Sequence, residues 1–183
     1  MNLNIKKNRK MQKYTLKVQI LRVIWGFFSI IFHLIPRPFY KTRNIILTIF
    51  GAKIGKNVQI SNSAKIYFPW ELQIGDFSSI GDNALIYNLA LVIIGHSSTI
   101  SQRAHLCTGT HDFESPSLEL LKKPIVLGDN VWVCADCFIS PGLNLKSGSI
   151  VGAGSVLTCD IDEYSIVAGN PAKFIKKRTI KNA

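Results

Sequence analysis

One histidine in this 183-residue chain stands where a side chain could carry acid–base chemistry. His111 lies near the start of a stretch of mixed polarity, CTGTHDFESPSLELLKKP, that occupies positions 107–124. An imidazole group can take up and return a proton near neutral pH, which makes it a natural general base. Asp112 and Glu114 follow closely enough in sequence to orient or charge-balance it. The first hypothesis is therefore that His111 is a catalytic base.

The stretch that carries His111 interrupts a repeat with a period of six residues. Neither an α-helix, with a period of 3.6, nor a simple strand, with a period of 2, produces this pattern, whereas a solenoid of short strands and tight corners does. Chance alternation in an ordinary β-domain is the alternative, and fifteen positions in register argue against it. The repeat positions are Ile54, Ile60 and Ile66; Ile74, Ile80 and Ile86; Ile94, Ile100 and Leu106; Leu127, Val133 and Ile139; Leu145, Val151 and Leu157.

The spacing predicts how the chain stacks. Three steps of six make one triangular coil, so fifteen positions make about five coils, and residues one coil apart should form inward columns. Small residues four positions later, such as Ala64, Ala84 and Ser149, should share the narrow interior. Leu106 and Leu127 are 21 residues apart, whereas the two earlier corners take eight, so a loop at 107–126 should protrude from the third coil. Long loops on rigid scaffolds commonly carry function.

Positive charge is concentrated in the N-terminal part of the chain. The formal net charge is +11; residues 1–70 contain thirteen Lys or Arg and no acid, whereas residues 71–183 contain nine basic and eleven acidic residues. A nucleic-acid-binding face would not be confined in this way, and the sequence contains no helix-turn-helix, zinc-finger or RNA-binding motif. Nucleic acid is therefore not an expected partner.

Residues 1–35 join a basic run to the apolar segment VIWGFFSIIFHLI at 23–35. This segment is short for a bilayer span, and Pro36-Arg37-Pro38 follows it instead of a small-residue cleavage site. It is expected to form a helix, either capping the open end of the solenoid or contacting an anionic membrane surface, and the two roles can coexist. After the prolines, a second short helix is expected at about 40–50.

The cysteines indicate little chemistry. Cys134 and Cys137 form a CxxC pair, which alone suggests redox or zinc chemistry. The six-residue register places Cys137 inward and Cys134 at a corner, so their thiols should point in different directions. Cys107 and Cys159 are isolated. We expect no metal site, and reduced cysteines in a cytoplasmic compartment.

Five stretches resemble the hexapeptide-repeat acyltransferases, and among them the colanic-acid-type acetyltransferases of exopolysaccharide biosynthesis. They are FGAKIGKNV (50–58), IGDFSSIGDNALIYNL (74–89), LCTGTHDF (106–113), PIVLGDNVWVCADCFISPG (124–142) and VGAGSV…YSIVAGNPAKFIKKR (151–178). The TGTHD element and the VAGNPAK ending are the most specific. The resemblance implies an all-β solenoid, a left-handed parallel β-helix of about five triangular coils. The expected organisation is a basic and apolar helical segment at 1–50, the β-helix at 51–172 and a basic C-terminal tail at 173–183.

The resemblance also implies transfer of an acetyl group from acetyl-CoA to a sugar hydroxyl. The histidine of TGTHD, His111, would be the general base. Asn88 matches an acceptor-side asparagine of related enzymes, with a corner hydrogen bond as the alternative role. Asp112 and Trp132 complete the expected substrate-binding set; Trp132 would shape the acetyl pocket or pack on the outer face. The acceptor stays open between a lipid-linked saccharide, a nucleotide sugar and a free glycan.

The family holds coenzyme A along its later coils, between neighbouring subunits of a trimer. A homotrimer is therefore expected, at the cytoplasmic face of the membrane if residues 1–35 contact lipid. Cys159 stands where many relatives carry Lys or Arg, which puts one phosphate contact in doubt. Small residues would let pantetheine approach the backbone, and lysines would meet the nucleotide phosphates. The positions that match are Ala135, Gly152, Ala153, Gly154, Thr158, Lys173, Lys176 and Lys177.

Two other classes of function fit the same fold. A zinc-dependent carbonic anhydrase of the gamma type would bring three histidines to one metal at a subunit interface, and His96, His105 and His111 supply that number. A non-catalytic solenoid scaffold would not need a histidine at the root of the loop. The TGTHD element and the VAGNPAK ending favour acyl transfer over both.

Overall fold

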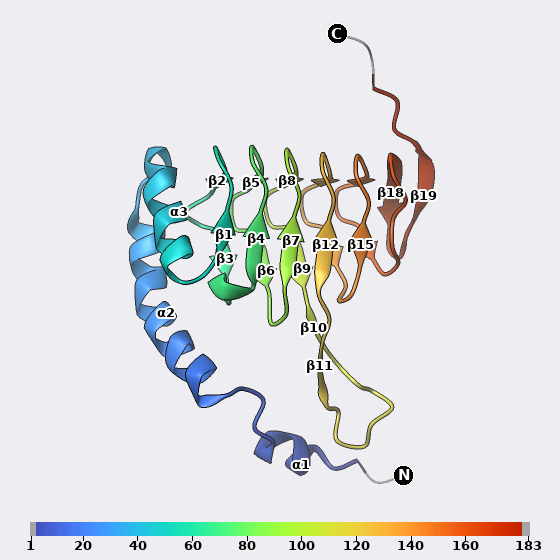
Figure 1. The fold of residues 1–183 in the computed structure, drawn as a ribbon. Helices are drawn as coiled ribbons and strands as arrows, with labels where there is room; N and C mark the ends of the chain where they lie inside the picture. The colour runs from blue at the N-terminus through green and yellow to red at the C-terminus, as the bar shows by residue number, and fades with distance from the viewer. Residues whose placement is uncertain (1–2, 181–183) are drawn as a thin grey trace.

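Short parallel strands from successive coils stack into three sheets around one narrow interior (Figure 1). The computed structural model describes residues 3–180. Sheet A contains β1 (Lys53–Ile54), β4 (Leu72–Ile74), β7 (Val92–Ile94), β12 (Ile125–Leu127) and β15 (Asn144–Leu145). Sheet B contains β2 (Gln59–Ile60), β5 (Ser79–Ile80), β8 (Thr99–Ile100), β13 (Trp132–Val133), β16 (Ile150–Val151), β18 (Ser165–Gly169) and β19 (Ala172–Lys177). Sheet C contains β3 (Lys65–Ile66), β6 (Leu85–Tyr87), β9 (His105–Cys107), β14 (Phe138–Ile139) and β17 (Val156–Leu157).

The predicted interior columns are confirmed by the strand register. In sheet A, Ile74 aligns with Ile54 on one side and with Ile94 on the other. The other two sheets repeat this alignment through Ile60 to Val151 and through Ile66 to Leu157. All fifteen repeat positions except Ile54 are buried. The small second residues expected inside are buried as well: Val58, Ala64, Ser78, Ala84, Ala104, Ser149 and Ser155.

The solenoid has about six turns, one more than the repeat predicted. Ile161 bridges to Leu145 in sheet A, and Val167 of β18 pairs with Val151 in sheet B. The count was low because the step from Leu157 to Ile161 is four positions instead of six. This tight corner puts the last turn out of phase with the six-residue step.

The C-terminal segment differs from the expected tail at 173–183. The chain reverses after β18, and β19 pairs antiparallel with it, from Gly169↔Ala172 to Ser165↔Lys177. Sheet B therefore ends on an added strand, and residues 181–183 of the expected tail lie outside the described residues.

Two helices of the N-terminal segment, α2 (Leu16–Leu34) and α3 (Tyr40–Ile49), cover the open end of the first coil, whereas α1 (Ile5–Lys10) lies near the protruding loop (Figure 1). The segment also forms the 3-10 helix η1 (Arg37–Phe39); a second short 3-10 helix, η2 (Pro69–Glu71), lies between β3 and β4. Helix α2 begins earlier than the apolar segment at 23–35, because Thr15 caps it by accepting a hydrogen bond from the N–H of Val18 at 3.4 Å. Helix α3 lies at the position, about 40–50, where the sequence predicted a second helix.

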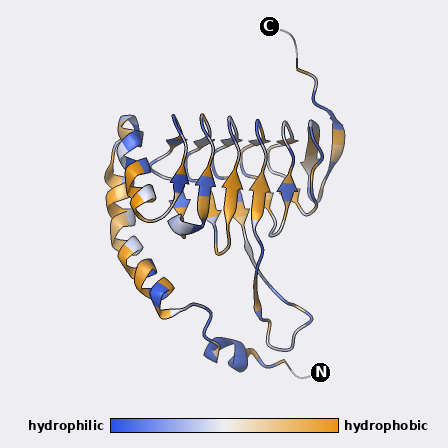
Figure 2. Ribbon diagram, in the orientation of Figure 1, coloured by the Kyte–Doolittle hydropathy of each residue, from blue (hydrophilic) through white to orange (hydrophobic). Residues whose placement is uncertain are grey.

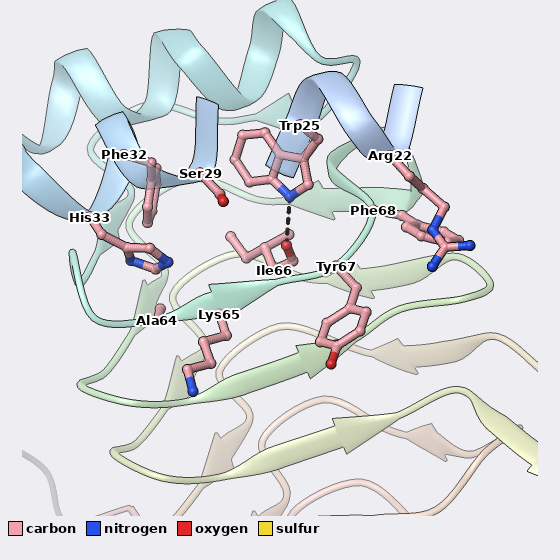
Figure 3. A pocket seen from close by; sticks show the side chains of 10 residues that line it. All are labelled: Arg22, Trp25, Ser29, Phe32, His33, Ala64, Lys65, Ile66, Tyr67 and Phe68. Carbon is pink, nitrogen blue, oxygen red and sulfur yellow. Dashed lines mark hydrogen bonds between the residues drawn. The ribbon is translucent and has the colours of Figure 1, made fainter. Parts of the chain in front are cut away.

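The capping role expected of the first helix is confirmed by its contacts. Trp25 and Phe32 are the buried residues of α2, and Trp25 Nε1 donates to the carbonyl of Ile66 at 2.8 Å (Figure 3). Arg43 of α3 is buried, and its guanidinium donates to four backbone carbonyl oxygens, including that of Ile60 at 2.7 Å. The bonds to Ile66 O and Ile60 O satisfy carbonyls at the exposed edge of the first coil, which no earlier strand covers. The other three carbonyls bonded to Arg43 belong to the linker between α2 and α3, at residues 35–37.

Candidate active site

The loop predicted at 107–126 is a two-stranded hairpin with its own hydrogen-bond ladder. Strands β10 (Gly109–His111) and β11 (Leu120–Lys122) pair antiparallel, with His111 opposite Leu120. The N–H of Asp112 extends the ladder by donating to Glu119 O at 2.8 Å. The hairpin projects beyond the coils from the corner between sheets C and A (Figure 1). The sequence predicted the protrusion, and its regular backbone was not foreseen.

Thr108 fixes the root of this hairpin to the preceding coil. Its side chain is fully buried, and Oγ1 both donates to Tyr87 O at 3.1 Å and accepts from the N–H of Ala90 at 3.0 Å. Across the root, the N–H of Lys123 donates to Thr108 O at 2.9 Å. A Cβ at Gly109 would lie 2.9 Å from a side-chain carbon of the underlying coil, so only glycine fits without a shift. The residues before His111 in the TGTHD element thus hold the hairpin in place.

The imidazole of His111 is exposed, and a backbone carbonyl holds one of its two nitrogens. Nδ1 lies 2.7 Å from Leu118 O, across the hairpin. A carbonyl oxygen only accepts hydrogen bonds, so Nδ1 must carry the hydrogen. In the neutral ring Nε2 then has the free lone pair. The arrangement presents a proton acceptor at the surface of the hairpin.

Asp112 does not orient His111. Its Oδ1 accepts hydrogen bonds from the N–H groups of Glu114 at 3.1 Å and Ser115 at 3.3 Å, so the carboxylate holds the turn of the hairpin. The orienting group is instead the carbonyl of Leu118. The prediction that Asp112 contacts substrate stays a prediction, because its Oδ2 atom is not used in these bonds.

Asn88 cannot bind a sugar as it stands in this fold. Its side chain is fully buried, and all its polar atoms are bonded. Oδ1 accepts from the N–H groups of Tyr67 and Phe68, and Nδ2 donates to the carbonyls of Phe68 at 2.6 Å and Glu71 at 3.0 Å. The prediction of an acceptor-binding role is therefore wrong, and the alternative, a corner hydrogen bond, is what the structure shows. The sequence could not distinguish the two because both require an amide next to a corner.

Trp132 lies on the outer face of sheet B. Its ring is about half exposed, and Nε1 donates to Ser101 Oγ at 2.9 Å. Sheet B lies across the interior from the corner that carries His111, so one chain does not bring these two side chains together. Trp132 packs on the outer face of the sheet. That it shapes an acetyl pocket stays a prediction, and this role would require a site shared between chains.

The residues expected to hold coenzyme A are brought together only in part. Ala135 and the turn at 152–154 occupy successive coils at the corner between sheets B and C, where the N–H of Gly154 donates to Ala135 O at 2.8 Å. Thr158 is exposed after β17, on the edge that carries the hairpin. Ala135 and the turn at 152–154 form an edge of small residues along the later coils, whereas Thr158 lies on a different corner of the solenoid.

The three lysines expected to meet phosphates lie on β19 and are exposed. Lys177 already donates from Nζ to Glu163 O at 2.7 Å and to Ser165 Oγ at 2.9 Å. This lysine stabilises the end of the solenoid, whereas Lys173 and Lys176 have no hydrogen bond or salt bridge from their ammonium groups among the described residues. The two remaining lysines are the better candidates for phosphate contact.

The three histidines considered as zinc ligands lie apart within one chain. His96 stands at the corner after β7, where Nδ1 accepts from the N–H of Asp76 at 3.0 Å. His105 lies on the outer face of sheet C, 5.0 Å from the ring of Phe138, and burial lowers the pKa of its imidazole. No group of three or more His, Cys, Asp or Glu that could hold a metal lies within residues 3–180. Cys137 is buried and Cys134 is half-buried, as the register predicted.

Two residues that contact the site were missed at the level of sequence. Leu118 supplies the carbonyl that orients His111, and Asn8 of α1 donates from Nδ2 to that same oxygen. A backbone acceptor carries no residue-type pattern, and Asn8 lies more than 100 positions away within a basic run. Neither residue could be identified from the types and spacing of residues in the sequence.

Comparisons with known proteins identify the fold and the family of the chain. No protein-family model matches the chain. It is 40% identical over 163 residues to a protein of Escherichia coli (strain K12) assigned as a colanic acid biosynthesis acetyltransferase, covering 89% of this chain and 88% of that one. It is 28% identical over 160 residues to the galactoside O-acetyltransferase of the same organism, covering 79% and 72% of the two chains.

Among solved structures, a hexapeptide-repeat acetyltransferase of Vibrio cholerae in complex with acetyl coenzyme A superposes with a TM-score of 0.85 at 21% identity, covering 95% of this chain and 96% of that one. This likeness identifies the solenoid as the left-handed parallel β-helix that the resemblance implied. The identity to the Escherichia coli protein extends over nearly the whole of both chains. The chain therefore belongs to the hexapeptide-repeat acetyltransferases, in the group of the colanic acid biosynthesis enzymes.

Proposed function

We propose that this acetyltransferase moves the acetyl group of acetyl-CoA to a sugar hydroxyl in the synthesis of a surface polysaccharide, with His111 as the general base. The observation that carries the proposal is the bond from His111 Nδ1 to Leu118 O, which leaves Nε2 as an exposed proton acceptor. The relatives support the substrate class, because one is assigned to colanic acid biosynthesis and another is a galactoside O-acetyltransferase.

The proposed reaction needs one proton acceptor and no covalent enzyme intermediate. His111 Nε2 takes the proton of the acceptor hydroxyl while that oxygen attacks the thioester carbonyl carbon. The carbon–oxygen bond forms, the carbon–sulfur bond breaks, and the imidazolium returns its proton to the departing thiolate. The bond to Leu118 O holds the ring in one tautomer throughout, and a corner backbone N–H is proposed to stabilise the oxyanion.

For acetyl-CoA we propose the small-residue edge formed by Ala135 and the turn at 152–154, together with Thr158 on the corner that carries the hairpin. Small residues there leave the backbone open to the pantetheine chain. Lys173 and Lys176 are placed to meet the phosphates. The Vibrio cholerae acetyltransferase of the same fold binds acetyl coenzyme A, which supports this choice of acyl donor. Cys159 next to Thr158 offers no cation, so we expect the lysines of β19 to carry the phosphate contacts alone.

We propose a homotrimer in which the site lies between chains. Within one chain, His111 is on the corner between sheets C and A, whereas Ala135 and Gly154 are on the corner between sheets B and C. A neighbouring chain must therefore bring its own edge to the hairpin. Two inactive variants, His111→Gln and Ala135→Trp, should regain part of the activity when unfolded and refolded together. No recovery after mixed refolding, or a fully active monomer in analytical ultracentrifugation, would overturn the shared site.

The test of the base is the variant His111→Gln, measured by acetyl-CoA consumption against a panel of glycan acceptors. We expect turnover to fall by about 100- to 10,000-fold, because general-base catalysis contributes that much, with an unchanged melting temperature. Glu114→Gln, three residues along on the exposed turn, is the matched control and should keep its activity. Near-normal turnover in His111→Gln would refute the assignment.

We also propose that α2 rests on the cytoplasmic surface of an anionic membrane, which favours a lipid-linked saccharide as the acceptor. Most of α2 is hydrophobic (Figure 2), and many of its apolar side chains are exposed. Val23, Phe27 and Leu34 are 63%, 68% and 75% exposed. By length and composition α2 is a candidate membrane span. Trp25 and Phe32 are, however, buried against the first coil, so the helix cannot cross a bilayer without leaving the solenoid.

Charge supports an anionic surface as the partner. Basic residues precede α2 and lie in its first turns, and the first acidic residue in the sequence is Glu71. Deleting residues 1–35 would uncover the end of the solenoid, so the double variant Val23→Ser, Phe27→Ser is the cleaner test. We expect it to lose co-sedimentation with vesicles containing anionic lipid while its melting temperature is retained. Unchanged binding, or equal binding to zwitterionic vesicles, would contradict the proposal.

A further inference from the structure

Helix α1 packs against the tip of the catalytic hairpin, far from it in sequence (Figure 1). The N–H of Asn4 donates to Pro116 O at 2.7 Å. Asn8 is the one buried residue of α1, at 6% exposure, while its neighbours on the helix face solvent. A buried amide on an otherwise exposed basic helix needs partners, and both of its partners lie in the hairpin.

The amide of Asn8 uses its donors on two consecutive carbonyls. Nδ2 donates to Ser117 O at 2.7 Å and also to Leu118 O. Leu118 O is the oxygen that accepts from His111 Nδ1. A carbonyl oxygen has two lone pairs, so it can accept from the amide and from the imidazole together. One backbone atom thus joins the N-terminal helix to the proposed base.

Leu118 has a backbone conformation that requires support. Its φ is +49°, in the left-handed region that branched and bulky side chains rarely occupy. Such a conformation persists when surrounding contacts over-determine it, and it is found preferentially at functional sites. Here the contacts are the N–H of Leu118 donating to Ser115 O at 3.0 Å and the two hydrogen bonds to its carbonyl.

We propose that Asn8 is a positioning residue for His111, acting through the carbonyl of Leu118; this inference rests on the proposed role of His111 as the base. Asn8 holds the Leu118 peptide in its strained orientation, and the peptide holds Nδ1–H so that Nε2 faces the acceptor. Without the amide, Leu118 can relax to negative φ, its carbonyl turns away, and the imidazole samples both tautomers and several rotamers.

The test compares Asn8→Ala with Ile5→Ala, a control at an exposed, uncharged position of the same helix. We expect kcat of Asn8→Ala to fall by about 10- to 100-fold, because small misplacements of a reacting group cost that much, with the KM for acetyl-CoA unchanged. Asn8→Asp keeps the size of the side chain but replaces the donating NH2 group by a carboxylate oxygen, which cannot donate to the two carbonyls. Its kcat should fall at least as far as that of Asn8→Ala. Equal kcat in Asn8→Ala and Ile5→Ala would overturn the proposal.

A second readout separates positioning from simple loss of the hairpin. Long-range proton–nitrogen NMR of the imidazole, assigned by comparison with His111→Gln, should show one tautomer with hydrogen on Nδ1 in the unaltered protein and a mixture in Asn8→Ala. An unchanged tautomer in Asn8→Ala would refute the link. If His111→Gln proves active while the tautomer still shifts in Asn8→Ala, the proposed function fails and the structural link stands.

Discussion

The coils and the hairpin are built from opposite kinds of contact. Each coil is held by the coils next to it: Ile100, fully buried, aligns with Ile80 on one side and Val133 on the other. The hairpin has one antiparallel pair of strands, and no other strand among residues 3–180 pairs with it. A single hairpin of this size is marginal in water, so its order must come from elsewhere.

The N-terminal segment supplies that order. It contacts the hairpin through Asn4 and Asn8 of the α1 region and through Lys122, whose ammonium donates to Lys13 O at 3.1 Å and lies 4.1 Å from the centre of the Tyr14 ring. The solenoid is stabilised by repetition, whereas the hairpin depends on contacts with a segment outside the repeat. Variants should therefore divide into those that change stability and those that change activity.

The largest effect on stability is expected from Ile100→Ala. Removing a fully buried isoleucine side chain from the inward column of sheet B leaves a cavity between two neighbouring coils. The free energy of unfolding should fall by about 2–5 kcal/mol, measured by chemical denaturation. Thr99→Ala, at the exposed position beside it, should change that energy by less than about 0.5 kcal/mol. A loss no larger than that of the control would mean that the columns are not closely packed.

A smaller loss is expected from Gly95→Ala, at a corner between coils. An added Cβ would lie 2.4 Å from the backbone oxygen of Gly128, which belongs to the next coil and cannot move alone. The cost should be about 1–3 kcal/mol, read from the denaturation midpoint. Gly26→Ala in α2 is the control, because nothing lies within 4 Å of its added Cβ and the helix should gain stability. Tolerance at Gly95 would show that the coils can separate locally.

Lys122→Met should affect the hairpin and leave the solenoid unchanged. Losing the bond to Lys13 O frees the N-terminal segment from β11, so we expect faster proteolytic cleavage between residues 112 and 119 and turnover reduced several-fold. The free energy of unfolding should change by less than about 1 kcal/mol, because one hydrogen bond to a charged group at a partly exposed site is lost. Lys17→Met serves as the exposed control. A cooperative loss of solenoid stability would contradict the division between the two regions.

The smallest effect concerns pH and Asp82. The hydroxyl of Ser61 donates to this carboxylate and lowers its pKa below the ordinary value, with a lesser contribution from Arg37. A depressed pKa stabilises the fold above the ordinary pKa of aspartate, and the contribution is lost as the pH falls through the folded-state value. The melting temperature of Asp82→Asn should therefore lie no more than about 2 °C below that of the unaltered chain at pH 7, and the gap should close toward pH 3. A gap that widens in acid would reverse the sign of this contribution.

The fold could be predicted from the sequence because its signal is local and repeated. Ile74, Ile94 and the other column residues follow one another at a step that only a solenoid accommodates, and each additional coil repeats the evidence. The last turn was missed where a four-residue corner broke the step. The position of His111 was predicted for a related reason: the interruption is visible only against a regular repeat.

The roles of the residues around His111 could not be predicted in the same way. Asn88 was expected either to bind substrate or to make a corner hydrogen bond, and it is buried with four hydrogen bonds at a corner. Asp112 was expected to orient or charge-balance the base and instead holds a turn. In both cases the residue type allowed either role, and the choice depends on which backbone groups lie beside it after folding.

The sequence by itself determined the solenoid, the protruding segment and the histidine that it carries, since period, side-chain size and the length of an insertion are properties of the chain. Only the tertiary structure decided what holds that histidine. The carbonyl of Leu118 and the amide of Asn8 meet at one point because α1 folds back across the hairpin. A hydrogen bond between a backbone oxygen and a residue more than 100 positions away has no counterpart in local sequence pattern.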